Sequence, residues 1–344
     1  MENINTNIQT KFNYSLKSHN TFGLDVYCSR FVEFSDIVGL REIISRADNN
    51  DKPLFVIGGG SNLLFTGDYD GTILHSAIKG FDYTFSENDV FLRCGSGEQW
   101  DDVVSLCVRN GWFGAENLSL IPGEVGASAV QNIGAYGVEA KDLICKVEAV
   151  DLKTGELHEF LNEDCCYSYR FSRFKSEWKG RFAITYVTYR LSKVFEPKLD
   201  YGNIRAELES RGIINPDALQ LRNVIIDIRN AKLPDPKIEG NAGSFFMNPV
   251  VPVTKYEEIA AKYDKVPHYP IDESHVKIPA GWLIDKCGWK GKRLGCAGVH
   301  ARQALVLVNL GGATGHDIMR LSDTVRGDVK ERFGIDIFPE VNII

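Results

Sequence analysis

Leu54-Phe55-Val56-Ile57-Gly58-Gly59-Gly60-Ser61-Asn62 is a short apolar run that ends in three consecutive glycines. The run predicts a buried strand, and the glycines predict a sharp backbone turn behind it. Successive N–H groups in such a turn can bind an anion, and Ser61 and Asn62 add side-chain donors. A tight turn between two strands explains the same residues, so this stretch alone leaves both interpretations open.

Two familiar phosphate-binding patterns do not fit this stretch. No Lys follows the glycines, which excludes the Walker pattern, and Leu63 stands where a Gly-x-Gly-x-x-Gly motif needs its third glycine. A second glycine-rich stretch, Ile121-Pro122-Gly123-Glu124-Val125-Gly126-Ala127-Ser128, continues into Gln131-Asn132-Ile133-Gly134-Ala135-Tyr136-Gly137. Small residues let a pyrophosphate or a flat ring lie against the backbone. Two such stretches in one chain favour a dinucleotide ligand.

The composition limits the classes of protein and partner. The 344 residues suit two or three domains, and 44% hydrophobic with 25% charged residues is typical of a globular protein. A formal charge of −7 argues against binding to nucleic acid or to an anionic membrane. An anionic ligand must therefore be met by local Lys or Arg side chains or by backbone N–H groups.

Cysteine and histidine usage indicates a reducing compartment and no metal. The eight Cys are scattered without a Cys-x-x-Cys pair, and the seven His show no zinc-like spacing. Residues 1–11 are polar and lack the apolar segment of a signal peptide. No apolar run approaches the ~20 residues that span a bilayer. We expect a cytoplasmic protein.

The pattern of apolar residues predicts interspersed helices and strands without a clear βαβ series. Helical spacing covers residues 37–47, 98–110, 215–231 and 314–329, and strands are expected at 54–57, 72–75, 90–94 and 336–343. Ser35 is the expected N-cap of the first helix, Gly111 the stop of the second, and Thr314 with Asp317 a capping box. We expect a loose start up to about residue 14.

Arg170 and Glu340 are charged residues for which the sequence leaves two interpretations. The guanidinium of Arg170 offers a fork for a carboxylate or phosphate, although a single Arg is more often a surface ion pair. Glu340 lies in an otherwise apolar strand, where a buried carboxylate needs a partner or a chemical role. An exposed strand face is the ordinary alternative for a glutamate.

Ser244 lies between glycines and aromatic residues in Gly240-Asn241-Ala242-Gly243-Ser244-Phe245-Phe246. Phe246 replaces the second glycine of a Gly-x-Ser-x-Gly elbow, and His300, the only tempting basic partner, fits a structural role equally well. A hydrolase triad is therefore disfavoured. A serine without an evident base suits proton donation better than nucleophilic attack. A turn or capping serine is the simpler interpretation of the segment alone.

Taken together, these segments resemble the UDP-N-acetylenolpyruvoylglucosamine reductase family. They occur in the family's order and extend over nearly the whole chain from about Leu16. The matching segments are Asn20-Thr21-Phe22-Gly23, Gly58 to Asn62, Leu120 to Gly123, Gln131 to Gly137, Tyr169-Arg170, Tyr201-Gly202, Lys232 to Lys237, Gly240 to Pro249, Ala280 to Asp285, Gln303 to Val306 and Pro339-Glu340-Val341.

The resemblance implies an α+β fold with an FAD-binding module of the vanillyl-alcohol-oxidase (PCMH) type in two subdomains and a C-terminal α+β substrate-binding domain. Residues 1–79, completed by a closing strand at 335–344, would form the first subdomain. Residues 80–233 would form the second subdomain, and residues 234–334 would form the substrate-binding domain.

The resemblance also implies a reaction. NADPH would give a hydride to non-covalently bound FAD, from which it would pass to C3 of UDP-N-acetylglucosamine enolpyruvate to make UDP-N-acetylmuramate. This step belongs to peptidoglycan synthesis, and so to cell wall biogenesis, cell shape, the cell cycle and cell division. We expect a cytoplasmic monomer that needs neither nucleic acid, membrane nor metal.

The family's functional residues map onto matching positions. Arg170 would hold the substrate carboxylate, a protonated Glu340 would stabilise the developing enolate, and Ser244 would protonate C2. The implied substrate-binding residues are Tyr201, Lys232, Asn248 and Gln303, with Tyr201-Gly202 typical of the subtype that has a mobile tyrosine loop. The implied FAD-binding residues are Gly58, Gly59, Gly60, Ser61, Asn62, Ile121, Pro122, Gly123, Gly126, Ala127, Ser128, Ile133 and Gly134.

Three positions depart from the family pattern: Met247 replaces an expected Lys, and Phe171 and Arg173 flank Arg170 where an Asp and an apolar residue are expected. They put the neighbours of Arg170 in question more than Arg170 itself. Two alternatives stay open. Another flavin oxidase of the superfamily would keep the glycine-rich stretches without needing Lys232, Ser244 and Glu340 together. A non-catalytic nucleotide-binding protein would need neither Ser244 nor Glu340.

Overall fold

The computed structural model describes residues 8–47 and 53–344, and the chain forms two compact units. Unit 1 comprises Cys28–Gly59, Asp70–Ala231 and the N-terminal stretch up to Tyr14. Unit 2 comprises Ser15–Tyr27, Gly60–Tyr69 and Lys232–Ile344. One of the points at which the chain passes from one unit to the other lies within the first glycine-rich stretch, after Gly59.

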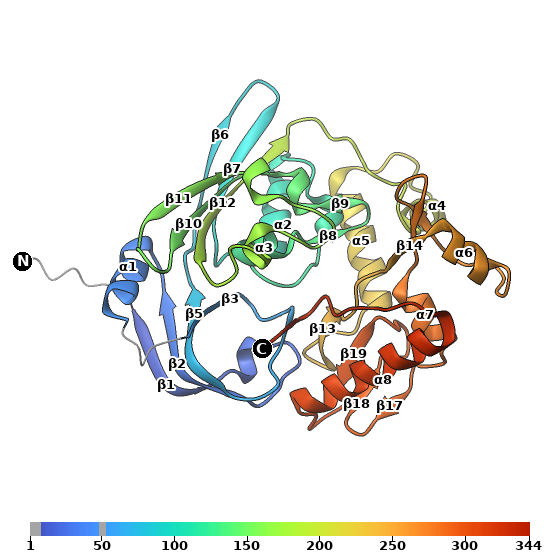
Figure 1. Cartoon of the computed structure of the whole chain (residues 1–344). Coiled ribbons are helices and arrows are strands. Elements are labelled where there is room, and N and C mark those ends of the chain that lie inside the picture. Colours follow the sequence, from blue (N-terminus) through green and yellow to red (C-terminus); the bar gives the residue numbers. More distant parts are fainter. Residues whose placement is uncertain (1–7, 48–52) are drawn as a thin grey trace, which may run out of the picture. The chain divides into compact units, whose positions relative to one another are not determined.

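The first sheet of unit 1 has four strands in the order β1-β2-β5-β3 (Figure 1). They are β1 (Gln9–Ser15), β2 (Tyr27–Phe34), β5 (Tyr69–Ser76) and β3 (Leu54–Ile57). β3 runs parallel to β5, and the last pair in their register is Ile57 with His75. Helix α1 (Ile37–Arg46) packs Leu40 and Ile43 into an apolar core with residues of β2 and β5. The three glycines therefore begin where β3 leaves the sheet.

The second sheet of unit 1 is antiparallel, with five strands in the order β11-β10-β12-β7-β6. They are β11 (Leu157–Leu161), β10 (Ile144–Asp151), β12 (Phe182–Ser192), β7 (Asp89–Gly95) and β6 (Phe81–Phe85). Helices α2 (Trp100–Asn110) and α3 (Val125–Gln131) share one large apolar core with this sheet. The second glycine-rich stretch is thereby anchored, because α3 is part of it.

Three smaller pieces complete unit 1. A short hairpin, β8 (Gly134–Ala135) and β9 (Val138–Glu139), follows α3. Its two turn residues, Tyr136 and Gly137, both have positive φ, as a tight hairpin of this kind requires. Helices α4 (Ile204–Ser210) and α5 (Ala218–Lys232) pack on each other through a separate apolar cluster.

Unit 2 is built on a four-stranded sheet in the order β13-β19-β18-β17 (Figure 1). Its strands are β13 (Gly240–Ser244), β19 (Val306–Asn309), β18 (Ala297–Val299) and β17 (Arg293–Leu294). A three-stranded sheet comprises β14 (Val250–Pro252), β16 (His275–Lys277) and β15 (Tyr269–Pro270). The helices are α6 (Val253–Ala260), α7 (Ala280–Lys286) and α8 (Gly315–Phe333).

The end of the chain pairs with the residues that follow the first glycine-rich turn. Strand β20 (Asn342–Ile343) is parallel to β4 (Leu63–Leu64) within unit 2. The regular strand is shorter than the expected 336–343, because Phe338 and Glu340 form main-chain hydrogen bonds with Met247 and Phe245 outside β20. The division of the chain into two FAD-binding subdomains and a substrate-binding domain stays a prediction.

The α+β class is confirmed, and so are the stop of α2 at left-handed Gly111 and the capping box of Thr314 with Asp317. The N-cap expected at Ser35 is wrong: the Asp36 side chain accepts the N–H of Gly39 at 2.7 Å. The expectation of a loose start is wrong for the residues that form β1. The exposed side chains of β1 give no apolar alternation in the sequence, although its main chain pairs with β2. Residues 1–7 lie outside the described residues.

Candidate active site

The two glycine-rich stretches lie against each other in unit 1. A Cβ added to Gly59 would lie 3.6 Å from the Cα of Gly123, and one added to Gly58 would lie 3.3 Å from the Cβ of Ala127. Gly60, at φ +68°, would collide through a Cβ with the carbonyl of His19. A side chain is therefore excluded at Gly60, would be tight at Gly58 and would make ordinary contact at Gly59.

Part of the second stretch holds α3 in place. The N–H groups of Val125 and Gly126 donate to the carbonyls of Glu98 and Ser96, both at 2.9 Å. The hydroxyl of Ser128 is buried, donates to the carbonyl of Val125 at 2.7 Å and lies 2.8 Å from the hydroxyl of Tyr189. These groups are already bonded within the protein, so the structure gives Gly126 and Ser128 a packing role. Their contact with FAD stays a prediction.

Glu124 is a buried carboxylate in this cradle for which sequence reasoning predicted no role. Its Oε1 lies 3.2 Å from Nε2 of His75 and 3.4 Å from Nε2 of Gln99. The other ring nitrogen of His75 lies 2.9 Å from Oε2 of Glu33. Burial by itself lowers the pKa of His75, but hydrogen bonds and charges of Glu124 and Glu33 raise it above its ordinary value. Nothing in the local sequence links these positions.

Arg170 lies in a tight turn with an uncommon backbone conformation. Its φ is +103°, which is a strained region for a residue with a side chain. The carbonyl of Ser168 accepts the N–H of Arg170 and, at 3.2 Å, that of Phe171. The Nζ of Lys175 donates to the carbonyl of Arg170 at 3.3 Å. Arg173 points into a different network, with its Nε 3.1 Å from Oε2 of Glu177.

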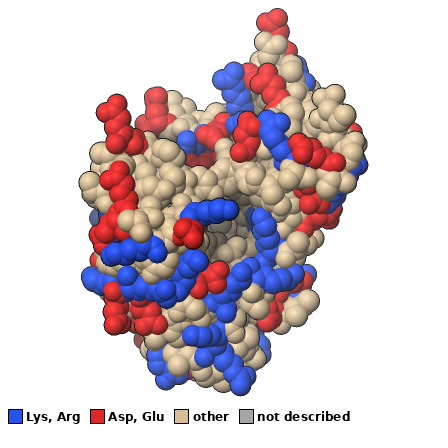
Figure 2. All heavy atoms as spheres, turned by 90° about the vertical axis from the view of Figure 1, so that its right-hand side faces the viewer, with Lys and Arg blue, Asp and Glu red and all other residues tan. Residues whose placement is uncertain are grey.

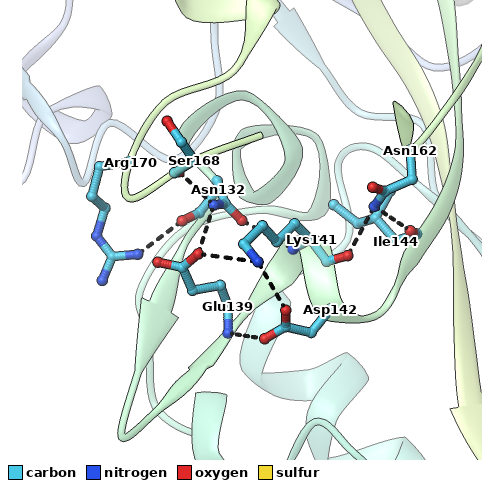
Figure 3. Close-up of polar contacts among 8 residues, drawn as sticks. All are labelled: Asn132, Glu139, Lys141, Asp142, Ile144, Asn162, Ser168 and Arg170. Carbon is cyan, nitrogen blue, oxygen red and sulfur yellow. Dashed lines mark hydrogen bonds and ion pairs between the residues drawn. The ribbon is translucent and has the colours of Figure 1, made fainter. Parts of the chain in front are cut away.

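The guanidinium of Arg170 reaches the segment that follows α3 (Figure 3). Its Nη1 donates to the carbonyl of Asn132 at 2.8 Å, and its Nη2 donates to the carbonyl of Gly134. A Cβ on Gly134 would lie 2.6 Å from Nη1. Gly134, expected as an FAD contact, is therefore in contact with Arg170, and its contact with FAD stays a prediction.

Tyr201 is 44% exposed and lies beside the β8–β9 hairpin. A Cβ on Gly137 would lie 3.3 Å from the Cβ of Tyr201, and one on Gly202 would lie 3.7 Å from the ring of Tyr136. The buried amide of Asn117 donates to the carbonyls of Tyr136 and Lys198, at 2.8 and 2.9 Å. Asn117 thus connects Lys198, at the base of the tyrosine loop, to the β8–β9 hairpin.

Ser244 and Glu340 come from distant parts of the sequence to adjoining segments of unit 2. Ser244 ends β13 opposite Val306, directly before Phe245, whose carbonyl accepts the N–H of Glu340 at 2.8 Å. Phe246 forms a bridge with Pro339. The amide of Asn62 donates to the carbonyl of Glu340 at 3.4 Å. One end of the first glycine-rich stretch, the candidate proton donor and the candidate carboxylic acid therefore share unit 2.

Asn248 and Gln303 converge on the start of α7. The Oδ1 of Asn248 accepts the N–H of Ala280 at 2.9 Å, and a Cβ on Gly281 would lie 3.4 Å from Oε1 of Gln303. Lys232 is the last residue of α5 and the first residue of the Lys232–Ile344 segment of unit 2. The predicted substrate-binding residues other than Tyr201 thus belong to unit 2, whereas Tyr201 and Arg170 belong to unit 1.

Basic side chains gather on one face of the molecule (Figure 2). Figure 2 shows one face on which Lys and Arg side chains gather, although the whole chain carries a formal charge of −7. Local basic side chains are what a phosphorylated ligand requires. Within residues 8–47 and 53–344, no group of three or more His, Cys, Asp or Glu side chains could hold a metal ion. None of the helices that the structure describes is long and apolar enough to cross a membrane.

Comparison with known proteins identifies two domains along the chain. A family model described as an FAD binding domain matches residues 29–161, so the chain is of the FAD-binding class. A second, described as the C-terminal domain of UDP-N-acetylenolpyruvoylglucosamine reductase, matches residues 235–344.

Curated relatives match over nearly the whole length. A UDP-N-acetylenolpyruvoylglucosamine reductase from Bacteroides fragilis is 55% identical over 332 residues, covering 96% of this chain and 99% of the relative. One from Flavobacterium johnsoniae is 44% identical and covers 98% of this chain and 100% of the relative. The chain therefore belongs to the UDP-N-acetylenolpyruvoylglucosamine reductase family.

A solved structure supports the fold. The reductase of this name from Thermus caldophilus has a TM-score of 0.68 at 22% identity, covering 98% of this chain and 99% of that one. At this level of identity the likeness concerns the fold.

Proposed function

We propose that the chain reduces UDP-N-acetylglucosamine enolpyruvate to UDP-N-acetylmuramate with NADPH, using non-covalently bound FAD, in peptidoglycan synthesis. The observation that carries this proposal is the 55% identity to a reductase of this name over 96% of the chain. The placement of Ser244 and Glu340 on adjoining segments supports it, because the reaction needs a proton donor beside a group that stabilises an enolate.

The small-residue cradle fits FAD. Gly58, Gly59 and Gly123 bring two backbones close together, and Ser61 and Asn62 follow directly with polar side chains. When bound, FAD carries the hydride from NADPH to C3 of the enolpyruvyl group. The protein's part is to bind both substrates, exclude water and handle charge and protons.

Three residues carry the protein's part of the chemistry. Arg170 binds the substrate carboxylate with its planar fork of donors. Glu340, in its protonated form, donates a hydrogen bond to the negative charge that develops when hydride reaches C3. Ser244 then gives its hydroxyl proton to C2. Tyr201, Lys232, Asn248 and Gln303 bind the UDP-sugar, and the ammonium of Lys232 suits the diphosphate.

The direct test is NADPH oxidation by the purified protein with and without UDP-N-acetylglucosamine enolpyruvate. We expect a yellow protein that consumes NADPH rapidly only when this substrate is present, with UDP-N-acetylmuramate as product. A protein that purifies without flavin and cannot be reconstituted with FAD would contradict the proposal. Fast NADPH oxidation that ignores the substrate but follows oxygen would instead indicate a flavin oxidase.

We also propose that the protein is a monomer in the cytoplasm. Free thiols at all eight cysteines are compatible with a reducing compartment. NADPH and nucleotide-activated sugars are used there. Light scattering of the purified protein should give the 38.5 kDa of one chain, and twice that mass would contradict the monomer.

A further inference from the structure

Asn132 occupies a special position at the end of α3. It is the C-cap residue, with φ 48° and ψ 60°, and its N–H donates to the carbonyl of Ser128. This left-handed conformation is tolerated by Asn far better than by most residues with a side chain. Asn132 is also completely buried, so every polar atom of its side chain must find a partner inside the protein.

The side chain of Asn132 connects three segments (Figure 3). Its Nδ2 donates to the carbonyl of Ser168 at 2.7 Å and to Oε2 of Glu139 at 3.2 Å. Its Oδ1 accepts the N–H of Lys141 at 2.9 Å. The side chain therefore fixes the Arg170 turn against the β8–β9 hairpin.

The main chain of Asn132 contacts the other end of Arg170. Its carbonyl accepts Nη1 of the guanidinium at 2.8 Å, and Nη2 donates to the carbonyl of Gly134 two residues on. Asn132 thus holds this segment at two points: its side chain contacts the carbonyl of Ser168 in the turn, and its own carbonyl contacts the guanidinium of Arg170. A guanidinium has five N–H donors, so being held by two carbonyls is compatible with a further anionic ligand.

The turn needs such support, because Arg170 has a φ of +103°. A strained conformation of this kind persists only where surrounding contacts favour it. The carbonyl of Ser168 is shared by the N–H groups of Arg170 and Phe171 and by Nδ2 of Asn132. Without the Asn132 amide, the carbonyl of Ser168 would lose its hydrogen bond to the buried end of α3.

We propose that Asn132 is a positioning residue for Arg170: its side-chain amide holds the strained turn and its carbonyl orients the guanidinium toward the substrate carboxylate. The functional part of this inference depends on the role proposed above for Arg170. The structural part concerns only contacts within unit 1.

The main test variant is Asn132→Asp, which tolerates the left-handed backbone and keeps an oxygen for the N–H of Lys141. It removes both amide donors and places a second carboxylate beside Glu139. Asn132→Gly is the second variant, because glycine adopts this conformation without strain but has no side chain. Asn162→Asp is the matched control. The amide of Asn162 also donates to two carbonyls, those of Lys141 and Ile144 at 2.8 and 2.7 Å, on the side away from Arg170 in Figure 3.

The first readout is hydrogen exchange of the backbone amides at residues 168–171 in the FAD-loaded protein. We expect faster exchange of this segment in both Asn132 variants and no change in Asn162→Asp. This measurement does not depend on activity, so it separates the structural inference from the proposed function. Unchanged exchange in folded Asn132 variants would overturn the inference.

The second readout separates the two halves of the reaction. Asn132→Asp should slow substrate-dependent reoxidation of the flavin about 10- to 100-fold, the effect of misplacing a group by about 1 Å. Flavin reduction by NADPH should stay within about 3-fold, because Arg170 has no part in it. An equal loss in both halves, or no loss in an active enzyme with faster exchange, would overturn the inference.

A double-mutant cycle tests whether Asn132 acts through Arg170. In the Arg170→Ala background, Asn132→Asp should cause little further loss in the substrate-dependent half-reaction, because the group it positions is absent. Losses that multiply would show that Asn132 acts by another route. If no variant and no wild-type protein turns over the substrate, the proposed function fails, and hydrogen exchange still decides the structural inference.

Discussion

Ser244 ends β13 beside Phe245, whose carbonyl accepts the N–H of Glu340 at 2.8 Å. Ser244→Ala removes the hydroxyl proton and leaves the strand pairing intact. We expect flavin reduction by NADPH at nearly the wild-type rate and a substrate-dependent half-reaction slowed by about 10²- to 10⁴-fold, the usual contribution of a general acid. Rapid-mixing measurements of each half would show this. Equal losses in both halves would argue against proton donation.

Glu340 is expected to act as a hydrogen-bond donor in its protonated form. Glu340→Gln keeps an N–H donor of similar shape, whereas Glu340→Ala removes the donor. The Ala variant should slow the substrate-dependent half-reaction by about 10²- to 10³-fold, and the Gln variant should be much less affected. The comparison needs the same single-turnover measurement on both variants. A Gln variant slower than the Ala variant would rule out the protonated role.

At the scale of elements, helix ends were predictable where a signal lies within a few residues. Gly111 stops α2 in the left-handed conformation, and Thr314 begins α8 with a capping box, both as the sequence predicts. The N-cap of α1 is Asp36, one residue after the expected Ser35, because the Asp36 side chain accepts the N–H of Gly39. When two neighbouring residues cap helices about equally well, the sequence does not show which of them is the N-cap.

His75 links β2, β5 and the segment before α3 through Glu33 and Glu124. These carboxylates raise its pKa in the folded protein above the ordinary 6.5, despite burial. A raised pKa stabilises the fold fully below about pH 6.5. This stabilisation is lost as the pH rises through the folded-state pKa. Both carboxylates contact the ring from elements that pack beside it.

We expect the wild-type protein to be more stable than His75→Gln below about pH 6.5, and to lose this advantage as the pH rises above that value. The advantage is the difference between their free energies of unfolding, measured by denaturant titration at a series of pH values. Titrating groups that do not interact with His75 affect both proteins alike and cancel in the difference. A difference that stays constant across the series would contradict the ionic link between His75 and the two glutamates.

At the scale of the molecule, FAD should stabilise the fold. A ligand that binds only the folded state adds about 2.7 kcal/mol at a concentration 100 times its Kd. We expect the unfolding temperature of the apoprotein to rise steadily with added FAD, followed by thermal scanning. Gly60→Ala should show a smaller rise, because its Cβ would collide with the carbonyl of His19 and displace the loop. A midpoint independent of FAD would contradict the cradle.

The α+β class, the family and the choice of candidate residues could be predicted from the amino-acid sequence. They follow from local spacing and from an ordered set of short segments. The contacts between these residues became visible only in the folded chain. Arg170 reaches the carbonyl of Asn132 across 38 positions, His75 meets Glu124 across 49, and Asn62 contacts Glu340 across 278. Such contacts depend on the path of the whole chain, because no local period encodes which distant segment will lie alongside. The strained turn of Arg170 and the buried Asn132 that holds it were therefore visible only in the folded protein.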